Sequence, residues 1–100
     1  MPDLGLEKDE LAAIIAVFRK YPAILRADIF GSRAKGGYKP YSDIDIAVYG
    51  EIDTLDVEAI ICELDELPVT CKFDVVSYES IKNPALREHI DRIGVIIYEK

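Results

Sequence analysis

Apolar residues recur along the chain at two spacings, and each spacing predicts a different kind of element. Three stretches repeat apolar positions every three or four residues, which is the period of an amphipathic helix, and Pro22 and Pro68 end the first two. Shorter apolar runs between turn residues have the length of strands. The predicted helices are residues 7–20, 53–67 and 83–92, with a short helix at Ser32–Gly36. The predicted strands are Ile24–Phe30, Asp43–Tyr49, Lys72–Val76 and Val95–Tyr98.

These predicted helices and strands alternate over 100 residues, a length typical of one domain with one core. Alternation by itself favours a parallel sheet covered by helices. No internal repeat, low-complexity segment or linker divides the chain. We therefore expect a single domain over residues 1–100, of the α/β (α+β) class, with a small sheet of about four strands flanked by helices.

Composition and charge argue against several classes of function. No apolar run reaches the about 20 residues that cross a membrane, and the N-terminus does not have the pattern of a signal peptide. The formal net charge of −7 argues against non-specific binding to nucleic acid. Cys62 and Cys71 lack metal-ligand spacing and are expected to be buried, reduced thiols, which favours a cytoplasmic protein.

Two carboxylates stand two residues apart in the second predicted strand. Asp43 and Asp45 should point to the same face, with Cα atoms about 6.5 Å apart, while Ile44 and Ile46 pack on the other face. Ionised carboxylates in this arrangement repel each other unless a cation or hydrogen-bond donors neutralise them. Mg²⁺ held by carboxylates and substrate phosphates meets that need. A solvated strand face is the alternative interpretation of the pair.

A glycine-containing turn precedes this pair by about ten residues. Gly31 and Ser32 lie between a predicted strand and a predicted helix start, where unpaired backbone N–H groups attract phosphate. Ser32 adds a hydroxyl and Arg33 a planar set of donors. Ser32 could also be only a helix cap, and Arg33 could form a surface ion pair. Turn and carboxylates together predict a nucleoside triphosphate held by its phosphates and by Mg²⁺.

The motif Gly31-Ser32-Arg33-Ala34-x-Gly36, followed after five residues by Ser42-Asp43-Ile44-Asp45-Ile46, resembles the signature of the minimal nucleotidyltransferases of the DNA polymerase β-like superfamily. The resemblance implies a short mixed sheet with a third carboxylate, Asp74, on a neighbouring strand. Alternatively, Asp74 could form an ion pair with Lys72 or be an exposed residue at the edge of the sheet. Lys35 stands where this family more often has arginine, and a lysine cannot bind phosphate bidentately.

The resemblance implies transfer of AMP from ATP to an acceptor hydroxyl, with release of pyrophosphate. Two Mg²⁺ ions would clamp the attacking and leaving oxygens, and Asp74 could also act as the general base. The residues implied as catalytic and metal-binding are Asp43, Asp45 and Asp74. The residues implied for nucleotide binding are Gly31, Ser32, Arg33 and Ser42, the last of which could instead brace the carboxylate pair.

Proteins of this kind are typically paired with HEPN-domain proteins in toxin–antitoxin modules, in which the antitoxin adenylylates a tyrosine of the toxin. The resemblance therefore implies a HEPN-domain partner as the acceptor. Two other functions stay open. The chain could be a non-catalytic module that binds a nucleotide or masks a HEPN-type protein, or a small-molecule nucleotidyltransferase completed by an oligomeric neighbour.

Four other residues have weaker expectations. Asp28 is expected at a strand end or sheet edge rather than as a metal ligand. His89, the only histidine, is expected on the surface of the last helix. Tyr38 and Tyr41, beside the turn, could flank a nucleotide base or simply pack within the loop.

Overall fold

A computed structural model describes residues 4–36, 39, 42–69 and 71–100, and contains one four-stranded sheet. The elements appear where the sequence predicts them, with one short 3-10 helix in a stretch expected to be a turn. The strands are β1 (Arg26–Phe30), β2 (Ile44–Tyr49), β3 (Phe73–Ser77) and β4 (Val95–Glu99). The helices are α1 (Lys8–Arg19), α2 (Ser32–Lys35), α3 (Thr54–Asp65), α4 (Pro84–Ile93) and the 3-10 helix η1 (Tyr78–Ser80).

The sheet is mixed and has the strand order β3-β2-β1-β4. β1 pairs antiparallel with β2 and with β4, whereas β2 and β3 are parallel. The mixed sheet implied by the resemblance is confirmed, and the all-parallel arrangement favoured by alternation is wrong. The reason lies in the connections. Parallel neighbours need a crossover of the chain, which α3 supplies between β2 and β3. The connection from β1 to β2, residues 31–43, contains only the four-residue helix α2, and the chain returns as an antiparallel neighbour.

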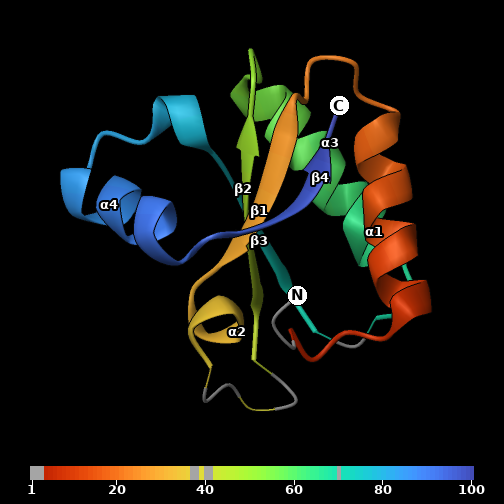
Figure 1. Cartoon of the computed structure of the whole chain (residues 1–100). Helices are drawn as coiled ribbons and strands as arrows, with labels where there is room; N and C mark the ends of the chain where they lie inside the picture. The colour runs from red at the N-terminus through yellow and green to blue at the C-terminus, as the bar shows by residue number, and fades with distance from the viewer. Residues whose placement is uncertain (1–3, 37–38, 40–41, 70) are drawn as a thin grey trace.

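Helices α1 and α3 cover one face of the sheet and α4 lies on the other (Figure 1). The alternation of side chains along β2 sends Ile44, Ile46 and Val48 into the core with α1 and α3. The opposite face has a smaller apolar cluster around Ala47, built with Phe30 and Ile90. By the same alternation Asp45 points to this second face, and its register partner Phe30 directly precedes the Gly31 turn and α2.

Two helices begin with a side-chain cap. The carboxylate of Asp53 accepts a hydrogen bond from the Asp56 backbone N–H at 2.8 Å, which begins α3. Asn83 accepts from the Ala85 N–H at 2.9 Å at the start of α4, where Pro84 is the first helical residue.

Asp28 is the clearest correction to the sequence-based expectations. It lies in the middle of β1, a central strand, and its side chain is only 1% exposed. Arg26, two residues away on the same face, donates two hydrogen bonds to its carboxylate at 2.8 and 2.7 Å, and the Tyr49 hydroxyl donates a third at 3.1 Å. The same guanidinium lies over the Tyr49 ring, which stacks on Tyr78. The Asp28 carboxylate is therefore buried because a neighbouring cation neutralises it.

Cys62 and Cys71 are not joined by a disulfide. Cys71 is half-buried, but Cys62 is exposed, so the expectation of two buried thiols is wrong for Cys62. Its position on α3 lies away from Ile60 and Leu64, which are the buried residues of that helix. Within the described part of the chain, no helix is long and apolar enough to cross a membrane.

Arg26→Met should destabilise the fold more than Asp28→Asn. The first change leaves a buried carboxylate without its cation, which costs about 3–5 kcal/mol. The second leaves a guanidinium whose side chain is 39% exposed and can be solvated, so the cost should be about 1–3 kcal/mol. Urea unfolding followed by circular dichroism at pH 7 measures both free energies. Equal losses would contradict this account of the pair.

Candidate active site

The three predicted carboxylates come from neighbouring strand ends. Asp45 and Asp74 are paired positions of the parallel strands β2 and β3, so their side chains leave the same face of the sheet. Asp43 directly precedes β2, two residues from Asp45, and its negative charge acts on Asp45. On the other side of β2, Phe30 is the register partner of Asp45. The turn that follows Phe30 thus begins beside the carboxylates.

The carboxylates differ in exposure, and this difference has an electrostatic consequence. Asp43 and Asp74 are exposed, whereas Asp45 is half-buried. Burial raises the pKa of Asp45, and the negative charges of Asp74 and then Asp43 raise it further, while His89 acts in the opposite direction. When these carboxylates are ionised they repel one another, and the repulsion adds to the effect of burial on the pKa of Asp45.

Gly31 contacts Asp45 so closely that no other residue fits. Its φ of +74° and ψ of −150° lie in a region that is essentially restricted to glycine. A Cβ placed on Gly31 would lie 2.2 Å from Oδ2 of Asp45. The backbone bend then continues into α2, where the Lys35 N–H donates to the Gly31 carbonyl at 3.0 Å. The turn and the carboxylate therefore form one packed unit, with exposed Ser32 beside it.

Arg33 lies in a different environment from the one expected for a phosphate ligand. Its side chain is buried, and its guanidinium donates to backbone carbonyls of the protein, including that of Ser42 at 2.9 Å. The Ser42 hydroxyl accepts from the Lys39 N–H at 2.9 Å, so Ser42 shapes the segment that enters β2. Lys35 and Lys39 are exposed. Tyr38 and Tyr41 lie outside the described residues.

His89 was expected on the surface, but it is half-buried under the sheet. Its ring meets the ring of Phe30 edge-on, with centroids 6.2 Å apart and an interplanar angle of 83°. His89 also interacts electrostatically with Asp45, the register partner of Phe30, and this interaction lowers the pKa of the Asp45 carboxyl. The sequence did contain a signal, because His89 stands three residues after Leu86 and one before Ile90, on the apolar stripe of its helix.

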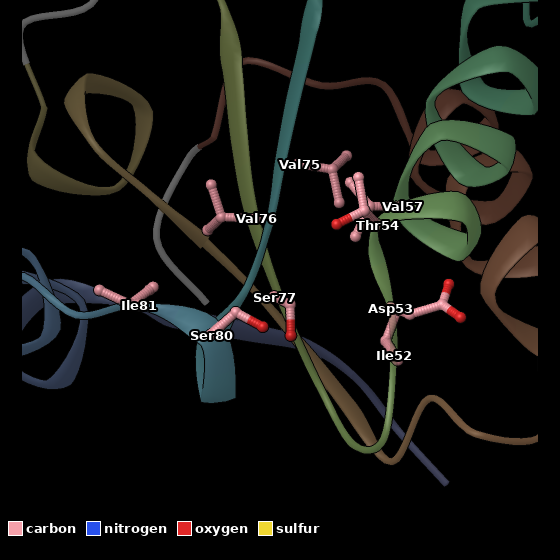
Figure 2. Close-up of a pocket in the computed structure, with 9 residues that line it drawn as sticks. All are labelled: Ile52, Asp53, Thr54, Val57, Val75, Val76, Ser77, Ser80 and Ile81. Carbon is pink, nitrogen blue, oxygen red and sulfur yellow. The ribbon is translucent and has the colours of Figure 1, made fainter.

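A pocket of about 290 Å³ opens at the far end of β3, away from the carboxylates (Figure 2). It lies between Ser77 at the end of β3, the start of α3 and Ile81. The Ser77 hydroxyl is buried and has no hydrogen-bond partner within the described residues. Asp53, the acidic residue in the lining, already caps α3. Asp43, Asp45 and Asp74 are not among the residues that line this pocket.

The carboxylates suit a divalent cation in their chemistry, although they are not arranged as finished ligands. In the ranges that the structure describes, no three His, Cys, Asp or Glu side chains form a group that could hold a metal ion. Carboxylate oxygens are nevertheless the ligands that Mg²⁺ prefers. A cation would also relieve the repulsion that raises the pKa of Asp45. Asp43, Asp45 and Asp74 therefore have the right chemistry to bind a divalent cation. The ion would have to bring their side chains closer to one another.

Comparison with known proteins gives consistent results. Residues 12–100 match the family model described as polymerase beta, nucleotidyltransferase. MntA of Haemophilus influenzae, named a probable protein adenylyltransferase, is 28% identical over 99 residues, which are 97% of this chain and 86% of MntA. MJ0435 of Methanocaldococcus jannaschii, named for the same activity, is 40% identical over 79 residues, which are 77% of this chain and 82% of MJ0435.

The fold also matches a chain of a solved complex, that of tri-AMPylated Shewanella oneidensis HEPN toxin with MNT antitoxin. The TM-score is 0.73 at 20% sequence identity, over 95% of this chain and 74% of that chain. At this identity the likeness concerns the fold.

Gly31→Ala should destabilise the protein more than Gly36→Ala. Both glycines have a positive φ, +74° and +97°, and an alanine in either place should cost about 1–3 kcal/mol of backbone strain. Only at Gly31 would the new Cβ also collide with Asp45, since nothing lies within 4 Å of a Cβ at Gly36. Thermal and urea unfolding of the two variants measure the difference. Equal losses would contradict the close contact between Gly31 and Asp45.

Asp45→Asn should stabilise the ion-free protein at neutral pH. Because the pKa of Asp45 is raised on folding, its contribution to stability is complete below the ordinary value of 3.8 and is lost as pH rises through the raised value. The melting temperature of the variant should therefore exceed that of the wild type at pH 7, and the gap should close near pH 3.

Glu58→Gln is the matched control, because it removes one negative charge from an exposed position on α3. Its melting temperature should follow that of the wild type across the pH range. Added Mg²⁺ should narrow the gap between wild type and Asp45→Asn by stabilising the wild type alone. A constant gap between pH 3 and pH 7 would show that Asp45 carries no raised pKa.

Proposed function

This chain belongs to the polymerase β nucleotidyltransferase family, and we propose that it transfers AMP from ATP to a tyrosine hydroxyl of a HEPN-domain partner protein. The observation that carries the proposal is the packing of Asp45 between the Gly31 turn and the strand that bears Asp74. Two relatives with names of protein adenylyltransferases support the activity. The shared fold with a chain from a complex containing an AMPylated HEPN toxin supports the class of partner.

In this proposal, the phosphates of ATP lie against the turn. The backbone amides beside Gly31 and the exposed hydroxyl of Ser32 donate to the phosphate oxygens, and Ser42 holds the adjoining segment in place. Asp43, Asp45 and Asp74 would hold two Mg²⁺ ions, which supply charge neutralisation for the triphosphate and a lower pKa for the acceptor hydroxyl.

The transfer balances as a single displacement. The acceptor oxygen forms a bond to the α-phosphorus of ATP, and the bond from that phosphorus to the bridging oxygen breaks, so pyrophosphate leaves. The hydroxyl proton goes to a base, and Asp74 is the proposed base because it is exposed on the face that an acceptor would approach. Asp45 is half-buried and packed against Gly31, so we assign it to holding the metal ions and not to accepting the proton.

The acceptor is proposed to arrive on another protein because Asp43 and Asp74 are both exposed, which leaves their carboxylates open to a large surface. The chain's charge of −7 makes nucleic acid a poor acceptor. The absence of a disulfide between Cys62 and Cys71 is consistent with the proposed cytoplasmic setting of this protein and its partner.

A second candidate is a module that binds a nucleotide or masks the HEPN protein without turnover. One observation favours it, namely that no ready-made group of three metal ligands exists among the described residues. The two candidates differ in whether a covalent label reaches the partner.

We expect label from [α-³²P]ATP to appear on a HEPN-domain protein supplied as the acceptor, in the presence of Mg²⁺ and this protein. Asp45→Asn should lower the rate roughly a hundredfold or more, because several kcal/mol of charge stabilisation are lost, while circular dichroism shows an intact fold. Glu58→Gln should label the partner at the wild-type rate. A tight complex without label would support the masking module, and full activity of Asp45→Asn would remove Asp45 from the mechanism.

A further inference from the structure

Arg33 heads the fully buried side chains by volume in the described structure, with 2% of its surface exposed. A guanidinium remains charged in proteins. Burying a charge costs several kcal/mol unless its N–H groups find partners. Arg33 is also the residue directly after the Gly31-Ser32 turn. The groups that accept hydrogen bonds from Arg33 therefore indicate the role of this buried cation.

The first acceptor is the peptide group that leads into the carboxylate pair. Nε and Nη2 of Arg33 both donate to the carbonyl oxygen of Ser42, at 3.2 and 2.9 Å. That carbonyl belongs to the peptide bond between Ser42 and Asp43. The planar fork fixes this bond relative to α2, because two donors on one rigid group define a direction as well as a distance.

The second contact reaches the segment before β3. Nη2 of Arg33 lies 3.0 Å from Sγ of Cys71, three residues before Asp74. Next to it, the backbone N–H of Ile44 donates to the carbonyl of Lys72 at 2.8 Å. The starts of β2 and β3 are thus joined to each other and to the same guanidinium.

The third contact binds Arg33 to the N-terminal segment of the chain. Nη1 donates to the carbonyl of Leu4 at 2.9 Å and approaches that of Gly5 at 3.4 Å. Leu4 itself is buried in the main core. Arg33 therefore connects the turn, both carboxylate-bearing strands and the core through one side chain.

We infer that Arg33 is a positioning residue: its buried guanidinium holds the Gly31-Ser32 turn and the starts of β2 and β3 together, so that a divalent ion can draw Asp43, Asp45 and Asp74 around itself. The inference rests on the proposed function for the use of those ions. It replaces the expected phosphate contact of Arg33, because the side chain faces the inside of the protein.

The test compares Arg33→Met, which removes the charge and the donors, with Arg33→Lys, which keeps a charge but lacks the fork. Arg92→Met is the matched control, since Arg92 is exposed on α4, where it pairs only with Glu88 among the described residues. Calorimetric titration with Mn²⁺ alone measures the affinity of the carboxylates without any turnover. Labelling of the HEPN-domain partner, well below each melting temperature, then gives kcat and the KM for ATP.

Arg33→Met should weaken Mn²⁺ binding and lower kcat by about 10- to 100-fold, the usual effect of removing a group that orients metal ligands. The KM for ATP should change little, Arg33→Lys should be intermediate, and Arg92→Met should match the wild type. If Arg33→Met does not fold, Arg33→Lys alone still shows whether the fork is needed.

Two results would overturn the inference. Either Mn²⁺ affinity and kcat stay at wild-type values in folded Arg33 variants, or only the KM for ATP rises, which would restore a phosphate contact. The proposed function fails separately: a wild type that binds Mn²⁺ but labels no partner, with weaker Mn²⁺ binding in Arg33→Met, would refute the transfer and leave the positioning role intact.

Discussion

The burial of the Asp45 carboxylate beside two other carboxylates, at one end of the sheet, is the constraint on which the rest of this structure depends. β2 and β3 place Asp45 and Asp74 side by side, and Gly31 leaves Asp45 no room to move away. Asp28 shows that the same fold can neutralise an acid when the role is structural, because Arg26 supplies two hydrogen bonds to it on the same face. The fold therefore contains two kinds of aspartate. One is satisfied internally, and the others keep unmet charge that only a ligand can satisfy.

The burial of Arg33 changes the charge that the site offers to an anion. In the sequence, Arg33, Lys35 and Lys39 form a small basic group against a net charge of −7. In the structure, Arg33 is directed inward and the two lysines are exposed. Less side-chain charge is then available at the surface, so the backbone amides of the turn, the Ser32 hydroxyl and bound cations must carry more of the phosphate recognition.

Local patterns predicted the elements well because they are decided by nearby residues. The two-residue period of strands was enough to place Asp45 on the face opposite Ile44 and Ile46, and Asn83-Pro84 marked a helix start correctly. Which strands are neighbours is not a local property, so the position of Asp74 beside Asp45 needed the family resemblance. The surroundings of Arg33 depend on carbonyls from Leu4 and Ser42, far apart in the chain. No spacing rule contains that information.

The mixed sheet also sets an order in which the molecule can assemble. β1 and β2 are consecutive antiparallel strands, so their pairing closes a short stretch of chain and costs little loop entropy. The parallel pairing of β2 with β3 must wait until α3 has crossed over the sheet. Gly31 and Asp45 can therefore meet early, whereas Asp74 arrives with the later strand. The repulsion between Asp45 and Asp74 is thus added to that between Asp43 and Asp45 only once the crossover helix α3 has brought β3 into the sheet.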